Sequence, residues 1–359
     1  MARRLRFANT AASPTSVNCG ACSRSSTERL RSLFRTSTFF PSPVRSSKST
    51  PMINLSRRDF LKLSSAAGLA VAAPLGSRAA GPHHRPGQSR LLLSLAAYSF
   101  RESFPTSRGK ANPKAPPAAQ AMDMFKFIDY CAAQGCAGTE LTSYFFAAET
   151  DDYLIKLRRH CFLRGIAISG TAIANNFSHP KGPKRDEEIA ATKKWIDRAV
   201  VLGAPHIRVF AGVTKEIPRA EADKLVVSAL EEVGDYASKK GIFLGLENHD
   251  SIGSAATLLP MIRSVNSPWV GINLDSGNFR TPDPYKDFAE CVPYALNVQL
   301  KADLIDGSGK KVDADNKRFT QLLRAGGYKG WVALEYEAPE SPVTAIPRHL
   351  KELRTLFSA

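Results

Sequence analysis

Four apolar segments in the later part of the chain each end in polar residues that are suited to acid–base or metal chemistry. In chain order, the motifs are Gly245-Leu246-Glu247-Asn248-His249, Asn273-Leu274-Asp275-Ser276-Gly277-Asn278, Asn297-Val298-Gln299-Leu300-Lys301 and Ala333-Leu334-Glu335-Tyr336-Glu337. Apolar and polar residues largely alternate in each motif, which is the pattern of a β-strand with two different faces. Carboxylates at such positions can move protons, and several together can bind a hard metal ion.

Strand alternation predicts that one set of these polar side chains converges in the interior of a barrel. The set comprises Glu247, His249, Asp275, Gln299, Lys301 and Glu335. Three carboxylates brought together repel one another unless a cation lies among them. Oxygen donors with at most one nitrogen suit Mn²⁺, Mg²⁺ or Co²⁺ better than a metal that prefers thiolates. We therefore expect one divalent metal ion bound by Glu247, Asp275 and Glu335.

Each of these residues also has a simpler explanation when it is taken alone. A glutamate at the end of a strand is commonly an ion-pair partner or a helix cap, and Asp275 is suitably placed for an Asx turn. His249 is equally well explained as a substrate-binding residue or as a loop residue. Glu140 and Arg208, at or within earlier apolar segments, are candidates for the barrel interior or for structural pairing. All four polar breaks fall at the same end of consecutive strands, and this favours a shared site.

From residue 91 onward, strand-like apolar segments alternate with helical patterns eight times. The expected strands are 91–98, 138–141, 167–173, 206–210, 243–247, 270–274, 295–300 and 331–335. The expected helices are 121–134, 151–163, 186–202, 220–239, 255–263, 285–291, 317–325 and 343–356. This order predicts an α/β fold, a (β/α)₈ TIM barrel in one domain over 90–359. An open doubly wound sheet is less favoured, because no Gly-rich dinucleotide motif follows the first strand.

One long basic, Pro-rich segment, 101–117, separates the first expected strand from the first expected helix. We interpret it as a mobile loop over the mouth of the barrel or as a solvated insertion.

The N-terminal segment carries an export signal. After Met52, the paired Arg57 and Arg58 precede a mildly apolar run over 63–73 and small residues near 79–80. This order predicts a twin-arginine signal peptide over 52–80, too short for a stable membrane span. Residues 1–51 are predicted to be a disordered leader or an over-called start, and a transit peptide is the alternative. We expect the mature protein to be periplasmic or otherwise extracytoplasmic.

The charge distribution bears on a nucleic-acid partner, and the cysteine content bears on disulfide bonds. The net charge is +16, but thirteen Lys and Arg fall within residues 1–80 against only Glu28 and Asp59. The rest of the chain carries about +5, so no nucleic-acid partner is expected. Four cysteines remain beyond the leader, at positions 131, 136, 161 and 291. We predict that they are buried small hydrophobic residues, with disulfides less favoured even in an oxidising compartment.

On these motifs, the chain over 91–356 resembles the sugar phosphate isomerase/epimerase group of xylose isomerase-like TIM barrels, which shares its fold with the family-2 apurinic endonucleases. The most specific parts of the likeness are 246–249, 274–278, 298–301 and 334–337. In the keto-sugar epimerase branch, a Glu, an Asp, a His and a second Glu bind one Mn²⁺-like ion. The resemblance implies Glu247, Asp275 and Glu335 as ligands, with Mn²⁺ favoured. Gln299 stands where the family usually has His, and an amide oxygen is a weaker ligand.

The resemblance also implies a reaction. A sugar isomerase or epimerase of this kind works through an enediolate, with Glu247 and Glu335 removing and returning the proton. Lys301 would stabilise the developing oxyanion. Further substrate-binding residues are expected at Glu140, Arg208, His249 and Asn278.

Three other functions are compatible with parts of this pattern. The same enolisation serves a 3-keto-glycoside lyase or hydrolase, and Gln299 at a ligand position is compatible with a non-catalytic sugar-binding barrel. An apurinic endonuclease is disfavoured, because it needs a histidine-rich trinuclear zinc site and only His249 qualifies. Sugar phosphates are cytoplasmic, so an exported member is expected to act on an unphosphorylated sugar. Stable membrane insertion is not expected, and a homo-oligomer is left open.

Overall fold

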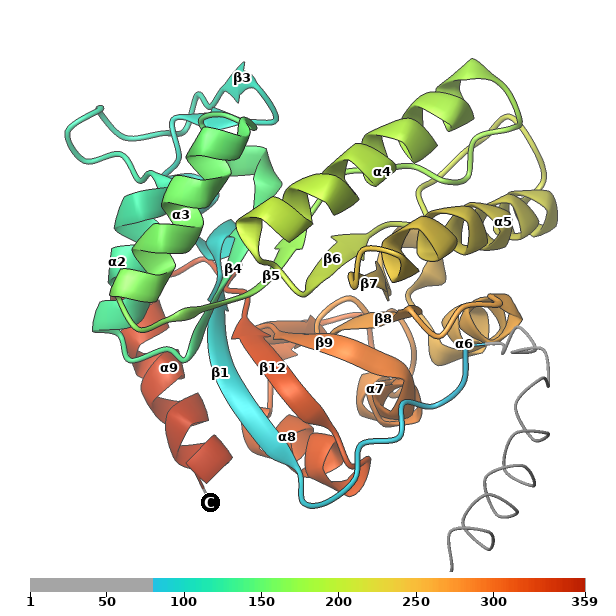
Figure 1. The fold of residues 1–359 in the computed structure, drawn as a ribbon. Coiled ribbons are helices and arrows are strands. Elements are labelled where there is room, and N and C mark those ends of the chain that lie inside the picture. Colours follow the sequence, from blue (N-terminus) through green and yellow to red (C-terminus); the bar gives the residue numbers. More distant parts are fainter. Residues whose placement is uncertain (1–79, 359) are drawn as a thin grey trace, which may run out of the picture. The chain divides into compact units, whose positions relative to one another are not determined.

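The computed structural model describes residues 80–358. Within this range, eight parallel strands form a closed barrel in the order β1-β12-β9-β8-β7-β6-β5-β4 (Figure 1). The strands are β1 (Arg90–Ala96), β4 (Gly138–Thr142), β5 (Ala167–Ala172), β6 (His206–Val209), β7 (Phe243–Glu247), β8 (Val270–Asp275), β9 (Ala295–Leu300) and β12 (Lys329–Leu334). The predicted (β/α)₈ barrel is confirmed, and each predicted strand overlaps an observed one.

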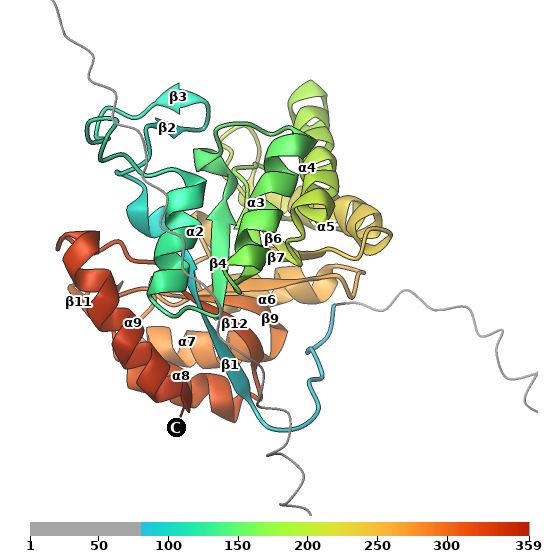
Figure 2. The ribbon, with the colours of Figure 1, turned by 60° about the vertical axis from the view of Figure 1, so that its left-hand side comes forward.

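Helices follow the barrel strands along the chain and surround them, as Figures 1 and 2 show. They are α2 (Met124–Ala133), α3 (Asp151–Leu163), α4 (Pro183–Leu202), α5 (Arg219–Ser238), α6 (Ala255–Ser264), α7 (Pro284–Cys291), α8 (Asn316–Ala325) and α9 (Pro342–Ser358). Side chains at several N-caps accept the first free backbone N–H groups; Asp123 accepts from Lys126 and Asp315 from Arg318. Gly203 ends α4 with a φ of 81°, a left-handed conformation that favours glycine at this position.

Strand parity separates an apolar layer from a polar interior. Leu244, Leu246 and Val298 are fully buried within the hydrophobic core. Residues of the opposite parity, such as Asn273 and Asn297, are equally buried but hydrogen-bond one another inside the barrel. The carboxyl ends of the parallel strands therefore bring polar groups together at one end of the barrel.

The segment 101–117 forms an ordered excursion instead of a simple loop. It contains a short hairpin of β2 (Thr106–Ser107) and β3 (Lys110–Ala111). Phe104 is fully buried and stacks on Phe145, with ring centroids 4.5 Å apart. Residues 106–117 are all exposed or partly exposed, as expected of a solvated insertion, and the buried Phe104 anchors the start of the segment to the core. The hairpin does reach the barrel mouth, where Arg108 lines a cavity.

The described chain begins at the other end of the barrel. The Ala80 N–H donates to the Val265 carbonyl, just before β8, and the His83 N–H donates to the Pro293 carbonyl, just before β9. The expected leader, 1–51, and nearly all of the expected signal, 52–80, lie outside the described residues. No helix within 80–358 is long and apolar enough to cross a membrane.

The cysteine prediction is confirmed for the described part of the chain. The thiols of Cys131, Cys136, Cys161 and Cys291 are buried and unpaired. Burial raises the pKa of Cys136 and of Cys161 to about 12, so these thiols are unreactive members of the core.

Candidate active site

One buried polar layer of the barrel consists of Glu140, Asn273, Asn297 and Gln299, which we call the floor network. All four residues are fully buried. The Asn297 Nδ2 donates to Glu140 Oε2 at 2.9 Å and to Asn273 Oδ1 at 2.8 Å. The Gln299 Nε2 donates to Glu140 Oε1 at 2.7 Å. The network thus satisfies the Glu140 carboxyl with amide donors alone.

Gln299 belongs to this floor through both ends of its side chain. Its Oε1 accepts a hydrogen bond from Asn273 Nδ2 at 2.6 Å, and its Nε2 reaches Glu335 Oε1 at 3.4 Å. The amide oxygen that the sequence assigned to a metal ion is thus already hydrogen-bonded. As placed, Gln299 acts as a link between Glu140 and Glu335.

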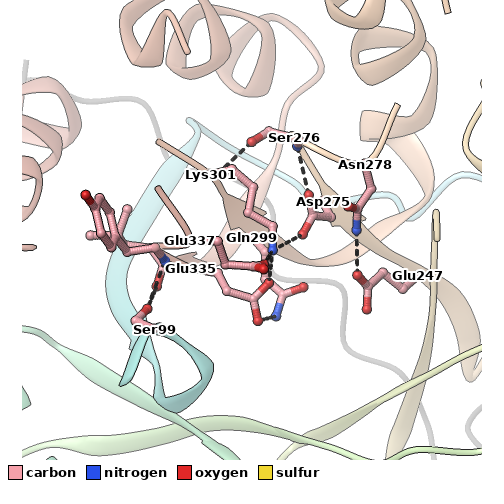
Figure 3. A network of polar contacts seen from close by, with 12 residues as sticks. Ser99, Glu247, Asp275, Ser276, Asn278, Gln299, Lys301, Glu335 and Glu337 are labelled. Carbon is pink, nitrogen blue, oxygen red and sulfur yellow. Dashed lines mark hydrogen bonds and ion pairs between the residues drawn. The ribbon is translucent and has the colours of Figure 1, made fainter. Parts of the chain in front are cut away.

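Lys301 lies at the centre of a second layer, which we call the acid–cation cluster: Asp275, Lys301, Glu335 and Glu337. Figure 3 shows its side chain between Asp275 on one side and Glu335 and Glu337 on the other. The ammonium lies 2.6 Å from Glu335 Oε2 and 3.3 Å from Asp275 Oδ2, and it also contacts Glu337. These carboxylates raise the pKa of Lys301 well above its ordinary value despite its burial. Lys301 is therefore the counter-ion of these carboxylates.

Asp275 is held at the end of β8 by hydrogen bonds that its backbone makes to a neighbouring side chain. The Asn248 side chain makes two hydrogen bonds to Asp275, donating to its carbonyl at 2.9 Å and accepting from its N–H at 2.8 Å. Asp275 Oδ1 accepts from the Gly277 N–H, the Asx turn considered from the sequence. The Lys301 ammonium, 3.3 Å away, is the partner of Oδ2. Burial raises the pKa of Asp275 to about 8, although Lys301 opposes the shift.

Glu247 has partners of its own on the opposite side of the site. Its Oε2 lies 2.9 Å from Arg208 Nε, and its Oε1 accepts a 2.8 Å hydrogen bond from Asn278 Nδ2 (Figure 3). Arg208 is anchored in turn by bonds to the Tyr144 hydroxyl and the Ile173 carbonyl. Burial raises the pKa of Glu247 to about 7, and the nearby guanidinium limits the shift. A carboxyl with a pKa near neutrality suits proton transfer.

A cavity of about 440 Å³ opens above these layers at the barrel mouth. Six residues predicted for the site line it: Arg208, Glu247, His249, Asn278, Lys301 and Glu335. The other three, Glu140, Asp275 and Gln299, do not line the cavity and are fully buried. The structure thus brings the predicted residues into one region but divides them between a cavity wall and a buried support.

The predicted metal ion can be compared with this arrangement. Glu247, Asp275 and Glu335 carry oxygen donors of the kind that a hard divalent ion prefers. However, the Lys301 ammonium already lies among the oxygens of Asp275 and Glu335. Within residues 80–358, no three His, Cys, Asp or Glu side chains are grouped as a metal site. As placed, these residues do not fit a metal ion, and the divalent ion stays a prediction.

Several site residues were not identified from the sequence. Glu337 lies two residues beyond Glu335, so strand parity would have found it. Asn273 and Asn297 share the parity of Asp275 and Gln299 and were equally recognisable. Tyr144, by contrast, comes from a 3-10 turn after β4, and no local pattern marks its contact with Arg208.

Comparison with known proteins gives two family matches. Residues 128–356 match the xylose isomerase-like TIM barrel family, which covers more than half of the chain. Residues 54–74 match the twin-arginine translocation signal, which supports export by that route, as predicted. A search of curated proteins found no match.

Solved structures of sugar epimerases share the fold. D-psicose 3-epimerase has 13% identity and a TM-score of 0.56, with 74% of this chain and 97% of that chain covered. The 3-keto-D-glucoside 4-epimerase from E. coli has 16% identity and a TM-score of 0.54, with 75% and 100% covered. A xylose isomerase-like protein from Mycobacterium smegmatis in complex with magnesium has 18% identity and a TM-score of 0.57, with 74% and 96% covered. From the barrel and the family match together, the chain belongs to the xylose isomerase-like TIM barrel family.

Proposed function

We propose that this protein is a sugar isomerase or epimerase that acts on an unphosphorylated keto-sugar or a related carbohydrate. The observation that carries the proposal is the pair of carboxylates on one cavity: Glu247 and Glu335 both line it, and each has a separate cationic partner. Two carboxylates facing one substrate are what a proton removal followed by a proton return requires.

The chemistry follows from these positions. One glutamate takes the proton from the carbon between the sugar's carbonyl and a hydroxyl group, and the bonding electrons move onto the carbonyl oxygen to form an enediolate. The Lys301 ammonium, which lines the same cavity, stabilises that negative charge. The second glutamate, in its protonated form, then delivers a proton. Delivery to the former carbonyl carbon, together with transfer of the hydroxyl proton to the former carbonyl oxygen, gives an isomer. Delivery to the opposite face of the original carbon, with the carbonyl formed again, gives an epimer.

Arg208 and Asn278 support this cycle by controlling Glu247. The guanidinium at 2.9 Å favours the carboxylate, whereas burial favours the neutral acid, and the pKa near 7 results from their opposition. Asn278 fixes the orientation of the carboxyl group through Oε1. The buried partner Tyr144 holds Arg208 in place, so the geometry is preorganised before a sugar enters.

Two alternatives use the same cavity. A 3-keto-glycoside lyase would begin with the same proton removal and then expel a leaving group from the next carbon. A sugar-binding barrel would use the cavity without proton transfer. The names of solved neighbours favour an epimerase, since D-psicose 3-epimerase and L-ribulose 3-epimerase share the fold.

Deuterium exchange tests the proposal directly. The mature protein is incubated in D₂O with a panel of keto-sugars, with and without Mn²⁺, Mg²⁺ or Co²⁺, and NMR follows deuterium at the carbon beside the carbonyl. We expect exchange together with formation of a second sugar. Glu247→Gln and Glu335→Gln should each reduce the rate by roughly 10²- to 10⁴-fold while binding persists.

Glu232→Gln is the matched control, because Glu232 pairs with Lys193 on the surface at 2.7 Å and is remote from the cavity lining. Its exchange rate should equal that of the wild type. Binding of a sugar without exchange under every metal condition would overturn the enzyme and leave the sugar-binding barrel. Release of a leaving group without an isomeric product would establish the lyase.

A further inference from the structure

A second cavity adjoins the one that holds Glu247 and Glu335. Its volume is about 490 Å³, against about 440 Å³ for the first, and both are within the usual size of small-molecule sites. The two cavities share four lining residues: Arg108, Tyr144, Ala174 and Asn175. We call the first cavity the inner chamber and the second the outer chamber. A ligand held in the inner chamber can therefore extend into the outer one.

The boundary between the chambers is a stacked pair of side chains. The Arg108 guanidinium lies 4.3 Å from the centroid of the Tyr144 ring. Arg108 sits at the turn of the β2–β3 hairpin with a φ of 51°, a left-handed conformation that a non-glycine residue rarely adopts. Its backbone N–H is tied to the Tyr144 carbonyl at 2.7 Å. The fold thus keeps a strained turn that holds Arg108 beside Tyr144.

The guanidinium N–H donors of Arg108 are unpaired at this boundary within the described residues. Within residues 80–358, its guanidinium forms no ion pair and no side-chain hydrogen bond, whereas the other arginine of the inner chamber, Arg208, is fully engaged. A guanidinium carries five N–H donors. An unpaired guanidinium between two chambers is suited to bind hydroxyl or ether oxygens of a ligand that passes over it.

The outer chamber combines an apolar wall with a carboxylate. Phe146 and Trp195 line it and pack edge to face, with centroids 5.9 Å apart. Glu188, on α4, also lines it, is partly exposed and has no ion-pair partner within the described residues. An aromatic wall accepts the C–H face of a pyranose, while a carboxylate accepts its hydroxyl groups. The Glu188 carboxylate already accepts a backbone N–H from Asn176, and its remaining lone pairs can accept hydroxyl groups of a ligand.

We infer that the substrate is a disaccharide-type ligand, with the reacting keto-sugar in the inner chamber and a second sugar ring in the outer chamber, against Trp195 and Glu188 and joined across Arg108. This inference rests on the proposed function for the reacting unit. The outer chamber is lined by Arg108 and Gly109 of the β2–β3 hairpin and by residues of α4. In Figure 1, the strand β3 lies above α3 in the upper left of the view, and α4 runs from beside α3 towards the upper right. The outer chamber is then a specificity site, separate from the groups that move protons.

A pair of neighbouring alanines on α4 provides the test. Ala191 is exposed and lines the outer chamber, whereas Ala190 is exposed but does not line it. Ala191→Trp should fill the outer chamber without disturbing the core, and Ala190→Trp is the matched control. Calorimetry measures the Kd of fructose and of two disaccharides that carry a free ketose unit, maltulose and isomaltulose. Deuterium exchange on the same sugars reports the chemistry.

In the wild type, at least one disaccharide should bind about tenfold more tightly than fructose. Ala191→Trp should abolish that advantage while leaving the fructose Kd within twofold, and Ala190→Trp should change neither. Equal affinity for fructose and both disaccharides, or a loss shared by both alanine variants, would overturn the inference. Exchange of fructose without a disaccharide preference would leave the proposed function intact. Tight disaccharide binding without any exchange would support a second sugar site in the outer chamber and would contradict the proposed isomerase or epimerase activity.

Discussion

The floor network and the acid–cation cluster are built from similar residues but balance their charges in different ways. In the floor, the Glu140 carboxyl is surrounded by amide donors from Asn297 and Gln299. In the cluster, the carboxyls of Asp275 and Glu335 share the ammonium of Lys301. Amide donors do not change charge, so the floor is a support. A cation beside a cavity can respond to charge that develops on a ligand, so the cluster is the part that can do chemistry.

Removing the cation of the cluster should give the largest change in stability. Lys301→Met leaves Asp275, Glu335 and Glu337 without a counter-ion and should lower the free energy of unfolding by about 3–5 kcal/mol. Urea denaturation measures it. Lys286→Met, which breaks an exposed pair with Glu290, should cost less than about 1 kcal/mol.

The same variant tests the predicted metal ion. Once the ammonium is gone, Mn²⁺ can occupy its place among the carboxylates, so added Mn²⁺ should stabilise Lys301→Met more than it stabilises the wild type. Equal stability of the variant and the wild type without metal would show that Lys301 is not the counter-ion on which the cluster depends.

The buried Glu140 of the floor network should make the free energy of unfolding depend on pH. Burial, assisted by Glu335, raises the pKa of Glu140 from 4.5 to about 7. Folding therefore favours the protonated acid: its stabilisation is fully present below about pH 4.5 and is lost as the pH rises through 7. Glu140→Gln should reduce the loss of unfolding free energy between pH 5 and pH 8 by roughly 2–3 kcal/mol. An unchanged pH slope, with Glu232→Gln as reference, would contradict the buried acid.

Substitution of Gln299 tests whether the floor network affects stability alone, without affecting the reaction at the acid–cation cluster. Gln299→Leu leaves Asn273 Nδ2 and Glu140 Oε1 without their partners and should cost about 1–3 kcal/mol of unfolding free energy. The rate per folded molecule should change only severalfold, because Gln299 does not line the cavity. A rate loss as large as that of Glu335→Gln would give Gln299 a direct role in the reaction, which would favour the metal-ligand role predicted from the sequence over a purely structural one.

The smallest effect is expected at the rim of the cavity. The His249 side chain is 40% exposed and its ring lies 4.8 Å from that of Phe210. His249→Ala should raise KM by about two- to fivefold and leave kcat unchanged, since a single exposed hydrogen bond contributes about 1 kcal/mol or less. A large fall in kcat, measured by the deuterium exchange assay, would place His249 among the proton-transfer groups.

Strand parity was the part of the sequence that predicted most. It placed Glu247, Asp275, Lys301 and Glu335 in the barrel because side-chain direction in a strand is set by position alone. It did not tell which polar residues would face the cavity, since depth along the barrel axis depends on the stagger between strands. Asp275, for example, is level with Gln299, and a register irregularity lies between Ile272 and Asn273.

The sequence also did not show which cation balances the carboxylates at the strand ends. Carboxylates at strand ends are compatible with a metal ion or with a basic side chain, and local spacing does not distinguish them. That choice depends on whether the Lys301 side chain bends towards Glu335, which is a tertiary contact. The outer chamber was missed for a related reason: Arg108, Phe146 and Trp195 come from three separate segments.

The attachment of the chain at Ala80 has a consequence for how the protein leaves the cell. Ala80 is hydrogen-bonded to Val265, at the barrel end remote from the cavity. A twin-arginine substrate crosses the membrane already folded, so the signal and the finished barrel coexist for a time. All described residues that line the cavity come from Tyr98 or later, so the barrel itself supplies the lining that the candidate site needs.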